Sequence, residues 1–316
     1  MFEVVIVGAG PAGLSAALSL GRVHRSVLVL DSGSGRNAPA AAVHNFVTRD
    51  GVAPAEFRAI GRAQLASYPT VEVRDAEAVD VEPFADGHGF TVRTADGAEY
   101  PASRLLLASG MVDRLPSIPG LAPLWGLSAF HCPYCHGFEI SGQSIAVLGG
   151  DPDRIRLALH LSRFSSDVVL CTNGPADLAS PAAQVLSRAG VTVRCEPITG
   201  FEATGPKLDA INFAEGPVLP RNVVFVKSAP AQRSPLTSLL GCGVFPDATV
   251  EVSEFHQTSV PGVYAAGDMA RRATVPIPFS AVIAAASAGT VAAGAIDQDL
   301  LSADFDLPNP FAVQER

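Results

Sequence analysis

The first thirty residues alternate between short apolar runs and glycine-rich or polar breaks, in a pattern that predicts a strand, a helix and a second strand. Residues 3–7 form a β-branched run that is typical of a buried parallel strand. Residues 14–21 follow with helical spacing, and a second apolar run at 26–30 ends in Asp31. Strands that end in glycine recur further along the chain, so we expect an α/β fold with parallel sheets.

Other stretches of the pattern predict a helix, a set of short strands and a long buried helix. Residues 56–66 carry apolar positions at helical spacing. Residues 71–99 alternate and contain turns at 86–87 and 96–97, which predicts a β-meander beside the main sheet. Residues 280–296 are nearly all Ala, Val, Ile and Gly. This segment is short and Ala/Gly-rich for a membrane span, so we expect a helix packed closely on a sheet or a cofactor.

The break after the first strand is a G-x-G-x-x-G fingerprint. Gly8 permits a tight turn, and Gly10 lets the backbone approach a pyrophosphate. Gly13 lets the helix pack on the strand, and Asp31 is placed to accept a hydrogen bond from a ribose hydroxyl. A bare glycine pattern is weak evidence, but the strand, the helix and the terminal acid all stand in register here. The segment therefore predicts a dinucleotide site.

Two later segments favour a flavin over a nicotinamide in this site. Residues 261–266 predict a strand that ends in Gly267-Asp268 and precedes the long small-residue helix. In flavoproteins with two dinucleotide-binding domains, such an aspartate contacts the flavin side of the cofactor, and the helix points its positive N-terminus at the flavin ring. Residues 105–110 are the matching strand that ends in Ser109-Gly110. The three elements together predict FAD.

The loop after the second strand contains residues with two open readings. Residues 33–42 are small and polar. Arg36 and Asn37 either contact the cofactor or are solvated loop residues. His44 and Asn45 either approach the flavin ring or are an ordinary loop histidine and turn asparagine.

A second strand-and-glycine module lies in the middle of the chain, but its fingerprint is altered. Residues 144–150 predict the strand and turn, and Asp151 then stands where a second glycine would approach a phosphate. Like-charge repulsion there costs on the order of 1 to 4 kcal/mol. Arg154 replaces a small packing residue, and the next strand ends in 171–175 without Arg or Lys. The module is expected to have lost nicotinamide binding, although Arg154 or Arg156 can still meet a phosphate.

The segment His131-Cys-Pro-Tyr-Cys-His136-Gly carries the predicted chemistry. Cys132 and Cys135 can cycle between dithiol and disulfide, and a helix start at this point would lower the thiolate pKa. His136 has an unperturbed pKa of about 6.5, so it can accept a thiol proton near neutrality. The pattern also matches haem attachment, which we discount in a flavin fold, and a zinc site would need a second ligand pair. No metal site is expected.

The other cysteines and the aromatic residues near this segment have simpler interpretations. We expect the three remaining cysteines to be inert small core residues; they are Cys171, Cys195 and Cys242. A set of apolar residues either lines a pocket for a small molecule or belongs to the core: Trp125, Phe130, Tyr134, Phe138 and the loop 276–279.

Composition narrows the class of protein. The 316 residues are 48% hydrophobic and 17% charged, which is typical of a globular chain with enough length for two domains. A net charge of −9 disfavours nucleic acid or an anionic membrane as a partner. Five cysteines do not form an even disulfide framework, and the start lacks the basic region of a signal peptide. We expect a soluble, cytoplasmic protein.

On these motifs the chain resembles the thioredoxin-reductase-like flavoproteins, a family of pyridine nucleotide-disulfide oxidoreductases, over nearly its whole length. The string from Cys132 to Glu139, the pair Arg36-Asn37 and the altered central module are most similar to the dithiol oxidases of holomycin and gliotoxin biosynthesis. The resemblance implies an FAD domain in two parts, 1–113 and 243–316, with a central degenerate NAD(P)H-like domain at 114–242 inserted between them. It also implies a homodimer.

The resemblance assigns roles to individual residues. It places the Cys135 sulfur against the flavin, leaves Cys132 to meet the substrate, and puts His136 where thioredoxin reductases carry an aspartate. The cofactor-binding residues that the fingerprints and the resemblance indicate are Gly8, Gly10, Pro11, Ala12, Gly13, Asp31, Ser32, Arg36, Asn37, Asn45, Ser109, Gly110, Gly267, Asp268, Val282 and Ile283.

The predicted reaction oxidises a small-molecule dithiol to its disulfide through Cys132 and Cys135, with FAD as cofactor and molecular oxygen as the acceptor that yields hydrogen peroxide. One alternative is a thioredoxin or disulfide reductase fed by NADPH or ferredoxin. A second is a non-catalytic FAD-binding redox sensor. Rapid flavin reduction by NADPH would favour the reductase, and turnover that is insensitive to Cys132 modification would favour the sensor.

Overall fold

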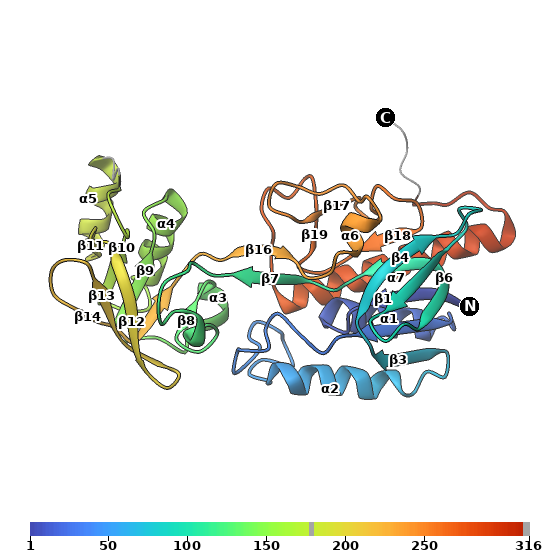
Figure 1. Ribbon diagram of the computed structural model, residues 1–316, viewed down its shortest axis with the longest axis horizontal. Coiled ribbons are helices and arrows are strands. Elements are labelled where there is room, and N and C mark those ends of the chain that lie inside the picture. The colour runs from blue at the N-terminus through green and yellow to red at the C-terminus, as the bar shows by residue number, and fades with distance from the viewer. Residues whose placement is uncertain (177–179, 312–316) are drawn as a thin grey trace. The chain divides into compact units, whose positions relative to one another are not determined.

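The chain forms two units, each built around a parallel sheet (Figure 1). The computed structural model describes residues 1–176 and 180–311. Unit 1 contains Met1–Ala38, Val52–Val112 and Pro230–Arg316, and unit 2 contains Pro39–Gly51 and Asp113–Ala229. The α/β class with one nucleotide-binding module inserted into another is confirmed.

Unit 1 has a seven-stranded sheet in the order β3-β2-β1-β6-β5-β4, with β18 paired to β6. Strands β1, β2, β3, β6 and β18 run parallel, whereas β4 and β5 continue the sheet antiparallel. The elements are β1 (Phe2–Val7), α1 (Pro11–Arg22), β2 (Val27–Asp31), α2 (Pro54–Leu65), β3 (Val71–Asp75), β4 (Ala78–Pro83), β5 (Phe90–Thr94), β6 (Glu99–Leu107), α6 (Leu236–Leu239), β17 (Val250–Val252), β18 (Val263–Ala265), β19 (Ala270–Arg272) and α7 (Val282–Phe305).

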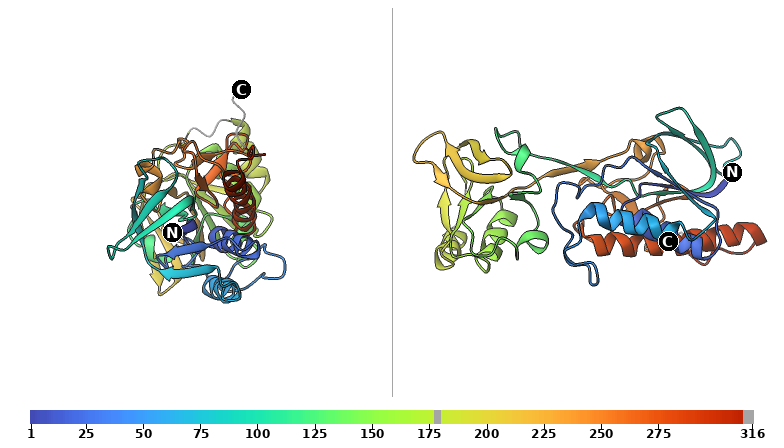
Figure 2. Two further views of the ribbon diagram at one scale, coloured as in Figure 1. Left: turned by 90° about the vertical axis from the view of Figure 1, so that its right-hand side faces the viewer. Right: turned by 90° about the horizontal axis from the view of Figure 1, so that it is seen from below.

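Both faces of the unit 1 sheet are covered, because β1 is buried on each side. Val4 and Ile6 point into a cluster with α1 and α7, and Val5 and Val7 point into a second cluster with β17 and β18. Helices α1, α2 and α7 lie together on one side of the strands (Figure 2). The alternating side chains of β1 therefore pack into two different hydrophobic layers, one on each face of the sheet.

The expected long buried helix is confirmed as α7, which packs along α1. A Cβ on Gly289 would lie 2.0 Å from the Ala12 carbonyl oxygen, so the two helices approach more closely than a side chain at this position allows. Leu300 near its end is also buried. Among the described residues, no helix combines the length and apolarity needed to cross a membrane.

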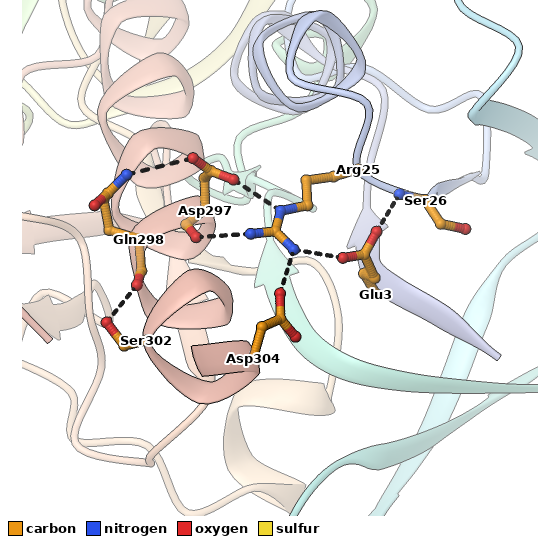
Figure 3. A network of polar contacts seen from close by, with 7 residues as sticks. All are labelled: Glu3, Arg25, Ser26, Asp297, Gln298, Ser302 and Asp304. Atoms are coloured by element: carbon orange, nitrogen blue, oxygen red, sulfur yellow. Dashed lines mark hydrogen bonds and ion pairs between the residues drawn. The ribbon is translucent and has the colours of Figure 1, made fainter. Parts of the chain in front are cut away.

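Helix α7 continues past the apolar segment because acidic residues on its last turns have cationic partners. Arg25 is buried and donates to Asp297, Glu3 and Asp304 at 2.7, 2.6 and 3.0 Å (Figure 3). Asp299 likewise accepts from Arg104 at 2.6 Å. These bonds tie the C-terminal half of α7 to the start of β1 and to β6.

Unit 2 has a five-stranded parallel sheet in the order β11-β10-β9-β15-β8, beside a three-stranded antiparallel sheet β12-β13-β14. One face of the parallel sheet packs on α4, and the other packs on residues of β12 and β13. The elements are the 3₁₀ turn η1 (Ala122–Leu124), β8 (Ala129–Phe130), α3 (Pro133–His136), β9 (Ile145–Leu148), α4 (Pro152–Leu161), β10 (Val168–Cys171), α5 (Ser180–Arg188), β11 (Thr192–Arg194), β12 (Ile198–Thr204), β13 (Lys207–Phe213), β14 (Leu219–Pro220) and β15 (Val223–Phe225).

Three expectations about the organisation need correction. The predicted meander exists as the antiparallel run from β4 through β5 to β6, but it is part of the main sheet rather than beside it, and β3 lies at the opposite edge of that sheet. The central module was expected to end at 242, but residues 230–242 belong to unit 1, where Leu236 and Cys242 join its core. Residues 39–51 were expected in the first domain and instead pack within unit 2. The chain passes between the units along β7 (Met111–Arg114) and β16 (Ala229–Gln232), which pair.

Candidate functional site

The glycine fingerprint of unit 1 forms the turn between β1 and α1. Gly8 has φ +109°, and a Cβ there would lie 2.4 Å from the Ala108 carbonyl oxygen. A Cβ on Gly13 would lie 1.8 Å from the Gly8 oxygen, so this position also excludes any side chain. Gly10 is the N-cap of α1, has no capping side chain and faces open space. The free amides at this helix start suit a pyrophosphate.

The acid at the end of β2 is oriented by two neighbours. The Asp31 carboxylate accepts from the Ala9 amide at 3.2 Å and lies 3.4 Å from the Arg62 guanidinium. Ser32 follows and is exposed. Arg62 was not predicted at this site, because its contact with Asp31 forms only when α2 packs on the sheet. The arrangement leaves the carboxylate at the mouth of the glycine turn, where a ribose would lie.

An ion pair joins the loop after β2 to the turn between β18 and β19, and a hydrogen bond joins the same loop to the residue two positions before α7. Arg36 donates to Asp268 at 2.9 Å and to the Ser280 hydroxyl at 3.0 Å. Two residues that were predicted separately, Arg36 and Asp268, are thus direct partners. Val282 and Ile283 form the first turn of α7 beyond Ser280. The hydrogen bond to Ser280 holds the loop near the N-terminus of α7.

The remaining predicted cofactor residues of unit 1 border the same turns. Pro11 and Ala12 open α1, and Gly267 has φ +84° with its Cβ position 3.1 Å from the Ala12 side chain. The Ser109 hydroxyl lies 3.5 Å from the Met269 sulfur, and Gly110 faces open space. Asn37 lies in the loop that carries Arg36.

These residues fit FAD. An uncapped helix start with a glycine in open space suits the pyrophosphate, the Asp31 carboxylate suits the ribose, and Gly110 leaves room at the other end. Asn45 is the one predicted cofactor residue that lies in unit 2. Its side-chain amide donates to the Tyr134 carbonyl oxygen.

The equivalent helix start in unit 2 is filled by the protein itself. The Asp151 carboxylate caps α4 by accepting from the amides of Asp153 and Arg154 at 3.1 and 3.3 Å. Lys227 lies 4.0 Å from the same carboxylate. The Arg154 side chain crosses the Gly149 turn, since a Cβ on Gly149 would meet its Cγ at 2.8 Å. Two amides at the start of α4 are therefore already bonded to the Asp151 carboxylate.

Cys132 and Cys135 form a disulfide with Cα atoms 5.3 Å apart. Cys132 is the N-cap of α3, as expected of a helix start, but α3 is only four residues long. The dipole of a single turn is small, so its expected effect on the thiolates is weaker than predicted. Both cysteines are partly buried, whereas Tyr134 between them is 71% exposed.

His136 follows the disulfide and sits in a dry environment. Its ring stacks on Phe130 with centroids 4.2 Å apart, and both ring nitrogens are buried without a hydrogen-bond partner among residues 1–176 and 180–311. Burial, together with the nearby His131 and His44, lowers the pKa of His136 to about 4. The expectation of an ordinary pKa is therefore wrong while the disulfide is intact. A thiolate formed beside the ring would favour its protonated form again.

The aromatic residues near the disulfide divide between core and surface. Phe130 is buried, and Trp125 stacks on His131 with centroids 5.4 Å apart. Phe138 is 83% exposed on unit 2. Ile277 and Phe279 are exposed on unit 1. The structure therefore does not gather these residues into one pocket within either unit.

The expectation of three inert core cysteines holds for two of them. Cys171 and Cys242 are buried, and burial raises the pKa of Cys171 to about 12 and also raises the pKa of Cys242. Cys195 is exposed just beyond β11, so its assignment to the core is wrong. Nothing in the strand pattern showed that the chain turns outward after Arg194.

Three residues near the redox segment had no assigned role before the structure: Asp50 and Glu139 were not predicted, and His44 had two open interpretations. His44 lies between Asp50 and Glu139, with ring nitrogens 3.4 Å from each carboxylate. Asp50 and Glu139 are 89 positions apart, so only the packing of residues 39–51 on unit 2 could reveal them.

No group of three or more His, Cys, Asp or Glu within 1–176 and 180–311 is placed to hold a metal ion.

Comparison with known proteins gives one family. The family model described as pyridine nucleotide-disulphide oxidoreductase matches residues 2–289. The chain is 36% identical to "Thioredoxin reductase tcpT" of Claviceps purpurea, over 84% of this chain and 86% of that protein. It is 30% identical to "Thioredoxin reductase sirT" of Leptosphaeria maculans, over 96% of both.

Solved structures show the same likeness. A putative thioredoxin reductase TrxB of Bacillus anthracis superposes with a TM-score of 0.89 at 32% identity, covering 96% of this chain and all of the other. A crystal structure of HlmI superposes with a TM-score of 0.87 at 36% identity, covering 96% of this chain and 94% of the other. The likeness spans both units.

Proposed function

The chain belongs to the pyridine nucleotide-disulphide oxidoreductase family and is an FAD-binding oxidoreductase, and within that family we propose that it is a dithiol oxidase that forms a disulfide in a small molecule. The observation that carries this proposal is the Asp151 carboxylate at the start of α4. Electrons need an entry other than a pyridine nucleotide, and the Cys132–Cys135 disulfide offers one.

The position in unit 2 where a nucleotide would bind, at the start of α4, is unfavourable for NAD(P)H for two reasons. A coenzyme phosphate would have to displace the Asp151 carboxylate, which already accepts from two amides. Residues 171–176, the described segment after β10, contain no Lys or Arg for a ribose phosphate. Thr172 bonds Gly174, and the Asn173 side chain accepts from the Ile198 amide. The neighbouring Arg194 is paired with Glu196.

The redox segment supplies the sulfur chemistry. A substrate thiolate attacks the Cys132 sulfur, the enzyme disulfide breaks, and Cys135 leaves as a thiolate. The second thiolate of the substrate then attacks the substrate sulfur of the mixed disulfide. This closes the disulfide of the substrate and releases Cys132 as a thiolate. The substrate loses two electrons and two protons, and the two enzyme sulfurs hold the electrons.

His136 is the proton acceptor in this scheme. It is neutral at pH 7 with a free nitrogen, and the charge of a new Cys135 thiolate would raise its affinity for the proton as the first step proceeds. Bound FAD supplies the two-electron acceptor for the dithiol, and we propose molecular oxygen as the final oxidant with hydrogen peroxide as product.

An oxygen electrode tests this proposal. Purified flavoprotein mixed with dithiothreitol under air is expected to consume oxygen and to form hydrogen peroxide in equal amount. Cys132→Ser and Cys135→Ser should abolish turnover, whereas Cys195→Ser, a change at an exposed thiol, should leave it unchanged. Absence of peroxide with every dithiol tried would reject the oxidase.

A second candidate is a disulfide reductase, because tcpT and sirT are named thioredoxin reductases. It uses the same cysteine pair in the opposite direction. Reduction of the flavin by NADPH faster than by dithiols would favour it.

A further inference from the structure

Arg36 connects three segments of unit 1 that lie far apart in the sequence. It belongs to the loop after β2, and its Nη1 donates to an Asp268 carboxylate oxygen at 2.9 Å and to the Ser280 hydroxyl at 3.0 Å. Asp268 lies in the turn between β18 and β19, and Ser280 lies two residues before α7. Because Nη1 of a guanidinium carries two hydrogens, these two bonds use both of them.

The turn that carries Asp268 packs beside the glycine turn of unit 1. Gly267 has φ +84°, and its Cβ position lies 3.1 Å from the Ala12 side chain. The Ala270 amide donates to the Gly267 oxygen at 3.1 Å and closes the turn. Ala12 belongs to the first turn of α1, where the FAD pyrophosphate is expected. The backbone next to Asp268 is therefore held against the start of α1.

The two carboxylates predicted to bind FAD each have a guanidinium beside them. Asp31 lies 3.4 Å from Arg62, and Asp268 lies 2.9 Å from Arg36. The side chains of Asp31 and Asp268 are only 15% and 23% exposed. A cofactor with a negatively charged pyrophosphate would remove further water from such a carboxylate and also repel it. A paired cation offsets both effects.

We propose that Arg36 is a positioning residue for FAD, which neutralises and orients Asp268 so that the other carboxylate oxygen can accept a hydrogen bond from the cofactor. Arg36 then acts through Asp268, and is neither a direct cofactor contact nor a solvated loop residue. Bound FAD shields the carboxylate from water, so the ion pair should matter most in the complex. The inference rests on the FAD-binding role predicted for Asp268, and it holds for either direction of electron flow.

The test is the FAD dissociation constant, measured by diluting the holoprotein and following the fluorescence of released FAD. Arg36→Met should weaken FAD binding about tenfold to a hundredfold, because the complex then contains an unpaired carboxylate. Arg36→Lys should recover most of the affinity, since one ammonium can pair with one carboxylate oxygen. Arg22→Met is the matched control: it removes an exposed cation at the opposite end of α1 and should leave FAD binding unchanged.

A double-mutant cycle with Asp268→Asn shows whether Arg36 acts through this carboxylate. The amide keeps an accepting oxygen but carries no charge, so there is no ion pair left to lose. Adding Arg36→Met to Asp268→Asn should therefore weaken FAD binding by less than about threefold. An arginine that bound a cofactor phosphate directly would cost the same factor in both backgrounds.

The outcomes separate the role of Arg36 from the assumptions around it. If Asp268→Asn and Asp268→Ala both bind FAD as tightly as the wild type, the predicted role of Asp268 is rejected. The role of Arg36 is overturned by wild-type affinity in Arg36→Met, by an equal loss in both backgrounds of the cycle, or by no recovery in Arg36→Lys. Dissociation of FAD needs no turnover, so a failure of the proposed dithiol oxidation would leave these results unchanged.

Discussion

His136 combines features that are costly in a folded protein and useful in a redox site. A buried ring with two unbonded nitrogens destabilises the protein, because its hydrogen bonds to water are lost without replacement. The stacking on Phe130 holds the ring in place, and burial keeps it neutral by lowering its pKa. In the proposed reaction, the neutral ring can then accept a proton when the Cys135 thiolate forms.

The pKa of His136 makes stability depend on pH. The folded pKa of about 4 lies below the unfolded value of about 6.5, so the unfolded chain binds the proton first as the pH falls. Stability should be level above pH 6.5 and should decrease between pH 6.5 and 4, by on the order of 2 kcal/mol for a partly exposed ring. His136→Phe should remove this contribution while keeping the stack.

Urea unfolding of wild type and His136→Phe at pH 7 and pH 4.5, with saturating FAD, measures the difference. Carboxylates titrate in both proteins and cancel. An equal loss of stability in the two proteins would contradict the low pKa.

The three free cysteines should differ in reactivity. Cys195 is exposed, whereas Cys171 and Cys242 are buried with raised thiol pKa values. In the oxidised native protein, a thiol-specific colorimetric reagent should therefore label one thiol rapidly, and Cys195→Ser should remove this phase. Rapid labelling of two thiols in the native protein would show that one of the buried sites opens.

At the scale of elements, the contact between α1 and α7 supports the cofactor turn. Gly289→Ala adds a methyl group against the Ala12 oxygen, one turn from Gly8 and Gly10. The change should destabilise the protein by about 1–3 kcal/mol and weaken FAD retention, because α1 must shift. Gly294→Ala is the control, since its Cβ position is open, and it should stabilise the helix by about 0.5–1 kcal/mol.

Thermal unfolding and the flavin content after gel filtration measure both effects. Equal stability of the two glycine variants would contradict the close helix contact.

The elements that could be predicted are those in which the hydrophobic periodicity and a characteristic residue, such as a turn glycine, indicate the same structure. The strand, glycine turn and helix at the start of the chain, and the long helix at its end, follow from local pattern alone. Asp151 was recognised as a misfit for a phosphate, but its role as a helix cap depends on backbone geometry at α4. The edge strands of the sheet and the outward turn at Cys195 depend on partners distant in sequence.

At the scale of the whole molecule, the chain carries two nucleotide-binding modules of which one is filled by its own side chains. The glycine turn of unit 1 is open and uncapped, whereas that of unit 2 is closed by Asp151 and Arg154. The segment that interrupts this symmetry is Pro39–Gly51, which comes from the first module and packs with the second. Its placement could not be predicted, because no sequence pattern marks a loop that changes partner.

The central claim is that sulfur, and not a pyridine nucleotide, delivers electrons to this protein. The most direct measurement is anaerobic stopped-flow absorbance of the bound flavin after mixing with dithiothreitol or with NADPH. The account predicts full flavin reduction by dithiothreitol, loss of that reduction in Cys132→Ser, and no comparable reduction by NADPH. Rapid reduction by NADPH, with Cys132→Ser as fast as the wild type, would contradict it.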